Sequence, residues 1–184
     1  GWGRPMARQI EAEIEVRAPV ERAAQVLRDA PESVVGSRPT GGPEHLLGEV
    51  PLDFHGGTSI HQQVEVILTP FDEVGDGGFA FELSWFPTRN RLLPAFAGML
   101  EGWDSAGRTT LRLSGAYHAP FGPAGVVGDA VLGKRVAKAS VGAFLAELAT
   151  RLDAEVDSRS AASLRPAEAT IDLRPFEAAE SWLG

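Results

Sequence analysis

Two hydrophobic periods divide this chain, and together they limit the folds that it can adopt. Between residues 9 and 118, several segments alternate apolar and polar residues, which is typical of strands with one buried face. Between about 124 and 157, apolar residues instead recur every three or four positions, which predicts one helix about 50 Å long. A sheet with one apolar face must cover that face, and this helix is the only predicted element long enough to do so.

The predicted strands follow one another with short turns between them. The first strand, residues 9–17, precedes a short helix over 19–29, and Pro31 ends that helix and allows one more turn over 31–36. The other predicted strands are residues 45–54, 59–69, 79–86, 92–103 and 108–118. Antiparallel sheets twist and curl. The sequence therefore predicts an α+β fold: a curved antiparallel sheet of about six or seven strands wrapped on the long C-terminal helix, with one or two short helices after the first strand.

The chain length of 184 residues fits a single domain with a sizeable core. We predict that this domain spans 6–157, because residues 1–5 resemble an expression remnant that precedes a natural start at Met6. Residues 158–184 lose the helical period and are predicted to form a tail, whose Ile171–Leu173 stretch and Phe176 could dock on the body.

Charge and composition exclude several kinds of partner. The net charge of −8 argues against nucleic acid or an anionic membrane surface as the main partner. No stretch reaches the ~18 apolar residues of an integral membrane segment, and no signal peptide is visible. The absence of cysteine excludes disulfides and thiolate chemistry, and it is compatible with the cytoplasmic location that we predict.

Several stretches resemble a known family. Residues Leu93–Phe96, Thr110–Tyr117 and Leu132–Ala137 carry the likeness most clearly, and the opening Ile14–Glu21 is also similar. They resemble the START-like superfamily, also called SRPBCC or helix-grip proteins, in an uncharacterised bacterial branch. That superfamily includes lipid-transfer domains, pollen allergens and polyketide cyclases. The resemblance implies a helix-grip fold that binds or transforms hydrophobic molecules.

The most aromatic strand supplies the first candidate ligand contacts. Phe81, Leu83 and Trp85 share one face of the segment 79–86, where they either line a pocket or form ordinary core. Gln62 interrupts the apolar face of 59–69, and an inward amide must find a partner in a ligand, a water or the backbone.

Further candidates lie on the last strand and the long helix. Tyr117 is the only tyrosine, and its hydroxyl could donate to a ligand, act as an acid or anchor on the backbone. The glycines of the helix, at 125, 128 and 133, thin its first half, and we predict that unfilled volume rather than close packing faces them. The predicted ligand-binding set is Gln62, Phe81, Leu83, Trp85, Tyr117, Gly128 and Val131, and no catalytic residue is assigned.

Other chemistries find little support. The four histidines show no metal-ligand spacing, so we predict neither a metal nor a cofactor. No phosphate-binding loop with a lysine and no G-x-S-x-G elbow is present. Arg89 and Arg91 lie in a predicted loop, where they are either solvated or placed to meet an anionic head group.

These features give three functional hypotheses. The first is binding or carriage of a small hydrophobic molecule, such as a lipid, isoprenoid or polyketide, in a cavity between sheet and helix. The second is an enzyme similar to polyketide cyclases or aromatases. The third is a protein-interaction adaptor with a vestigial cavity. The sequence favours the first, because the apolar faces carry few convergent polar groups. It leaves the ligand and the oligomeric state open.

Overall fold

A computed structural model describes residues 8–36, 44–54, 58–71, 75, 77–88, 95–118 and 130–165. The strands in that part of the chain are β1 (Arg8–Val16), β2 (His45–Phe54), β3 (Thr58–Phe71), β4 (Gly78–Pro87), β5 (Ala95–Ser105) and β6 (Arg108–His118). The helices are α1 (Val20–Asp29), α2 (Pro31–Val35) and α3 (Ala130–Leu164). The predicted α+β fold is confirmed, with a six-stranded sheet and two short helices after the first strand.

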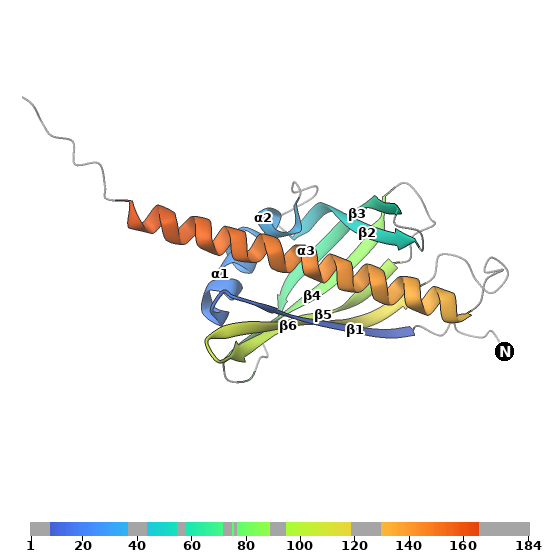
Figure 1. The fold of residues 1–184 in the computed structure, drawn as a ribbon, viewed down its shortest axis with the longest axis horizontal. Helices are drawn as coiled ribbons and strands as arrows, with labels where there is room; N and C mark the ends of the chain where they lie inside the picture. Colours follow the sequence, from blue (N-terminus) through green and yellow to red (C-terminus); the bar gives the residue numbers. More distant parts are fainter. Residues whose placement is uncertain are drawn as a thin grey trace, which may run out of the picture.

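The six strands form one antiparallel sheet in the order β1-β6-β5-β4-β3-β2. Strands β2 to β5 each pair with the next strand in the chain, and β1 completes the sheet by pairing with β6. The sheet curls, and α3 lies across its concave face (Figure 1). Helices α1 and α2 lie at one end of the sheet and contact α3 there.

Alternation within the strands decides which side chains meet α3. In β4 the buried side chains include Phe81, Leu83 and Trp85, each 1 % exposed, while Glu82 between them is exposed. The stripe of α3 that faces the sheet is equally apolar, with Ala137, Val141, Phe144, Leu145, Leu148 and Leu152 all buried. The predicted covering of the apolar strand faces by the C-terminal helix is therefore confirmed.

The end of α3 differs from the prediction. The helix continues to Leu164, beyond the predicted end at 157. The apolar period stops early because the last turns extend past the sheet and have no apolar surface to cover (Figure 1). Ion pairs between residues one helical turn apart stabilise these last turns. One example joins the Arg159 Nε and Glu155 Oε1 atoms, which are 3.0 Å apart. Pro166 then ends the helix, since the residue before a proline disfavours helical geometry.

Hydrogen bonds fix α3 to the junction between β1 and α1. The Asp153 carboxylate accepts from the backbone N–H of Arg17 at 3.1 Å and from that of Ala18 at 3.0 Å. The buried hydroxyl of Thr109 donates to the carbonyl oxygen of Ala18 at 2.7 Å, which ties β6 to the same junction. Arg151 donates to the carbonyl oxygen of Val35 at 2.9 Å. Helix α3 is thus fastened where α1 and α2 lie, and we call this the α1 end.

Candidate functional site

An aromatic cluster fills the space beneath the middle of α3. The Trp85 and Phe96 rings are stacked with their centroids 4.5 Å apart, and Phe144 of α3 packs on Trp85 at 4.9 Å. Dense packing of this kind leaves Phe81, Leu83 and Trp85 almost without exposed surface. In this conformation they are core residues. Their role as ligand contacts stays a prediction, because a ligand beside them would require the surrounding rings to move.

Glycines on the concave face make room for these rings. Gly98 of β5 lies opposite Gly115 of β6, and a Cβ atom built on either residue would come within 2.9 Å of the Phe96 ring. A Cβ on Gly102 would likewise collide with the Phe79 ring. This role of the glycines was not predicted from the sequence. Gly98 lies opposite Gly115 when β5 and β6 are placed in register, and that pairing would have indicated it.

Gln62 lies on the concave side of β3, as its sequence position predicted. It shares that side with Val64 and Val66, which are fully buried, and is itself half-buried. Among the residues that the structure describes, its side-chain amide has no hydrogen-bond partner. The amide therefore keeps a donor and an acceptor for a molecule that enters beside it.

Tyr117 also points inward and is 8 % exposed. It is the last residue but one of β6 and pairs with Phe96 of β5, so its ring adjoins the aromatic cluster. Its hydroxyl makes no hydrogen bond within the described part of the chain. Burial raises the pKa of the Tyr117 phenol above its usual value, so the group stays protonated and can donate a hydrogen bond at neutral pH.

Ser140 is a third inward polar group, and the sequence prediction omitted it. It is 2 % exposed in the apolar stripe of α3, and its Oγ atom finds no hydrogen-bond partner among the described residues. Most buried hydroxyls are hydrogen-bonded, so an unpaired one requires an explanation. The signal was present in the sequence, because position 140 falls at helical spacing between the apolar residues Ala137 and Phe144.

These three polar side chains lie toward one end of the interior. Tyr117 is near the end of β6, Gln62 is near the turn that joins β2 to β3, and Ser140 is in the third turn of α3. The strand pairing places these strand ends together, opposite α1 and α2, and α3 begins there (Figure 1). We call this the Tyr117 end.

Two predicted ligand contacts cannot be located in the same way. Gly128 lies outside the described residues, as do Gly125, Arg89 and Arg91. Val131 belongs to the first turn of α3, but its side chain is outside the described part. Both ligand assignments remain predictions.

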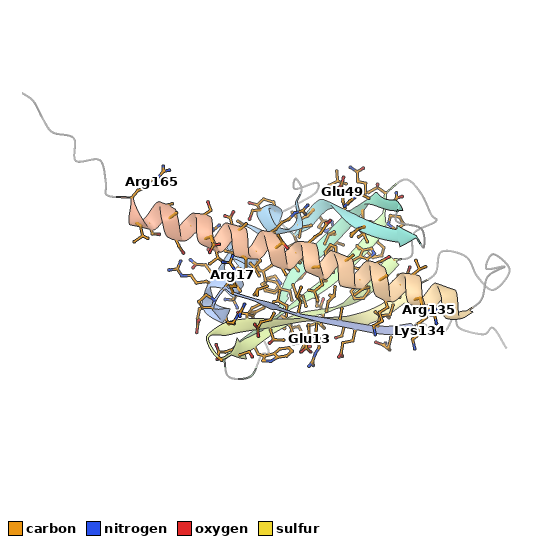
Figure 2. The ribbon with its side chains drawn as sticks, viewed as in Figure 1. Glu13, Arg17, Glu49, Lys134, Arg135 and Arg165 are labelled. Atoms are coloured by element: carbon orange, nitrogen blue, oxygen red, sulfur yellow. The ribbon has the colours of Figure 1, made fainter. Side chains whose placement is uncertain are left out.

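The Tyr117 end carries positive charge. Lys134, Arg135 and Lys138 are exposed in the first half of α3, and residues 130–146 contain no acidic residue. Figure 2 shows Lys134 and Arg135 where α3 begins, beside the start of β1. The positive end of the helix dipole adds to their field. The whole chain has a net charge of −8, so the charge at this end is opposite in sign to that of the protein. This positive charge favours the binding of an anionic group.

Two of the hollows that the described residues form at the surface lie next to α1. One, of about 290 Å³, lies between α1 and the last turns of α3, and the other, of about 230 Å³, lies between α1 and Gly77–Gly78. Neither hollow is lined by a predicted ligand contact. The same part of the chain contains no group of three potential metal ligands, and no helix in it is long and apolar enough to cross a membrane.

Comparison with solved structures identifies the fold. TTHA0849 from Thermus thermophilus superposes with a TM-score of 0.50 at 16% identity, covering 80% of this chain and 99% of that one. The Zhui aromatase/cyclase from Streptomyces sp. R1128 gives a TM-score of 0.51 at 18% identity, covering 85% of this chain and 97% of that one. No protein-family model and no curated protein matches the sequence. The chain thus has the START-like helix-grip fold that its sequence predicted.

Proposed function

We propose that this protein binds a small hydrophobic molecule between the sheet and α3, and that the molecule enters at the Tyr117 end. One observation carries the proposal: Gln62, Tyr117 and Ser140 turn polar groups inward at this end, and the Ser140 hydroxyl among them is fully buried without a hydrogen-bond partner in the described part of the chain. A buried polar group left unpaired costs about 1–3 kcal/mol. A ligand that supplies the missing partners recovers part of that free energy.

The chemistry of these groups describes the ligand. The protonated Tyr117 hydroxyl and the Ser140 hydroxyl can donate to a carbonyl or hydroxyl oxygen, and the Gln62 amide can donate and accept. The rest of the ligand is apolar, since it must replace contacts within the aromatic cluster around Trp85. An acidic group at one end would meet the cations of α3.

A titration with an apolar fluorescent probe tests the proposal. The wild type should bind the probe, and Gln62→Trp should weaken binding by at least about tenfold, because the larger side chain occupies the entrance. Gln63→Trp is the matched control, since Gln63 is the next residue of β3 and is exposed on the other side of the strand. It should leave the affinity unchanged.

Native mass spectrometry of the purified protein provides the second readout, through a co-purified molecule of defined mass. The carrier hypothesis fails if the wild type binds no apolar probe and carries no such molecule. The adaptor with a vestigial cavity would then be the better hypothesis. Equal weakening by both tryptophan variants would show that the probe binds elsewhere.

A second candidate function is catalysis of a cyclase type. It draws on the protonated, inward Tyr117 hydroxyl and on the fold shared with the Zhui aromatase/cyclase. A hydrogen bond from this hydroxyl could polarise a carbonyl oxygen during ring closure of a polyketide-like substrate, with the phenol keeping its proton because burial raises its pKa. Tyr117→Phe should then lower kcat by about 10²–10⁴-fold while probe affinity changes little. Unchanged turnover, or no turnover by the wild type, would leave binding as the function.

A further inference from the structure

We propose that the hollow between α1 and α3 is the docking site for the acidic segment that follows α3, residues 166–184. This hollow has a volume of about 290 Å³ and lies at the opposite end of the molecule from the proposed ligand entrance. Its lining residues are Arg22, Gln25 and Val26 of α1 and Val156, Arg159, Ala162 and Ser163 of α3.

The hollow combines an apolar floor with cationic walls. Val26 and Val156 are buried at its base. Arg22 has no carboxylate partner within the described part of the chain, and its only recorded contact is a hydrogen bond to the Ser160 hydroxyl at 3.4 Å. Arg159 pairs through its Nε atom with Glu155, which leaves its terminal nitrogens available as donors. In an extended peptide, two alternate apolar side chains can face the floor while the carboxylate between them points away from it toward the arginine side chains, and such a peptide would match this surface.

The segment after α3 has that composition. Residues 166–184 carry four carboxylate side chains and one arginine, so their charge is complementary to the hollow. Asp172 lies between Ile171 and Leu173, which gives the required order of apolar, acidic and apolar residues.

The chain is also long enough to reach the hollow. The eight residue steps from Val156 to Leu164 span about 12 Å of helix, and Figure 2 shows Arg165 at the far end of α3, beyond α1 and the sheet. An extended chain advances about 3.3 Å per residue, so about four residues cover the return distance after the chain reverses at Pro166. Residues near 171 are therefore far enough along the chain to reach the level of Arg22 and Arg159.

The lack of native cysteine allows a direct test by crosslinking in the full chain. Gln25→Cys in the hollow is combined with Ala169→Cys or Thr170→Cys, and the rate of disulfide formation under mild oxidation is measured by mass spectrometry. The control combines the same segment cysteine with Glu49→Cys, an exposed position on β2 away from the hollow (Figure 2). Docking should make the intramolecular disulfide form at least about tenfold faster than in the control, because it raises the effective concentration of the two thiols.

Charge reversal then identifies the contact. Asp172→Lys should remove most of the rate enhancement, and adding Arg22→Glu should restore part of it. High salt should lower the enhancement in the parent pair. The proposal is overturned if neither segment position crosslinks faster than its control, if the disulfides form mainly between two molecules, or if Asp172→Lys leaves the rate unchanged.

Discussion

The two ends of the interior differ in how their polar groups are satisfied. At the α1 end, the Asp153 carboxylate receives two backbone N–H groups, and the buried Thr109 hydroxyl donates to a carbonyl. At the Tyr117 end, the inward polar side chains of Gln62, Tyr117 and Ser140 have no partner among the described residues. The same sheet and the same helix form both ends.

This difference separates the part of the interior that holds α3 from the part where we propose that a ligand binds. A polar side chain that hydrogen-bonds to the backbone holds two elements in one relative position. A buried polar group without a partner lowers the stability of the unliganded protein, and a ligand that bonds to it can recover that free energy. The α1 end therefore holds α3 by hydrogen bonds, and the Tyr117 end is where we propose that a ligand supplies the missing partners. Natural proteins tend to place binding sites in parts of low local stability.

The largest expected effect concerns the apolar stripe of α3. Leu145→Ala or Leu148→Ala should each lower the free energy of unfolding by about 2–5 kcal/mol, because both side chains are buried and truncation leaves a cavity. Denaturant titration measures the change. A loss below about 1 kcal/mol would mean that α3 is not tightly held over the sheet, and the contrast between the ends would disappear.

A smaller effect tests the fastening at the α1 end. Asp153→Ala should cost about 1–3 kcal/mol, because it leaves the N–H groups of Arg17 and Ala18 without their partner. Asp157→Ala is the matched control: its ion pair with Arg17 is 3.0 Å long, but both side chains are 65% exposed. It should cost less than about 0.5 kcal/mol. Equal costs would show that charge, and not the backbone contact, fastens the helix.

The pH dependence of stability tests the burial of Tyr117. Its pKa is raised in the folded state, so above pH ~10 the unfolded chain loses the phenol proton before the folded chain does. Stability should therefore fall as pH rises through this range, by at most about 1.4 kcal/mol per pH unit relative to Tyr117→Phe. Because Tyr117 is the only tyrosine, the ultraviolet absorbance of phenolate reports its ionisation directly. Ionisation at the ordinary value in the folded protein would place the hydroxyl in water.

The smallest effect has the opposite sign. Ser140→Ala should stabilise the unliganded protein by about 0.5–1 kcal/mol, because it removes an unpaired buried hydroxyl and favours the helix. Probe affinity measured on the same variant shows whether the hydroxyl also contacts the ligand. A destabilisation above about 1 kcal/mol would mean that the hydroxyl already has a partner, and the two ends would then be alike in this respect.

Much of the fold could be predicted from local pattern. Alternation in the strands placed Trp85, Tyr117 and Gln62 on the concave side, because the direction of a side chain in a strand depends only on its parity. The end of α3 could not be found in the same way. Its last turns cover no apolar surface, so the helical period fades before the helix itself ends at Leu164.

The sequence by itself determined the order of elements, the face that every strand except β5 buries and the absence of cysteine. These follow from residue type and short-range spacing. Only the tertiary structure decided that the Phe96 ring covers the Gly98–Gly115 pair, that Asp153 binds the β1–α1 junction, and that Ser140 is buried without a partner among the described residues. Each of these depends on a contact between residues distant in sequence, and such contacts are set by strand register and by the placement of α3 over the sheet.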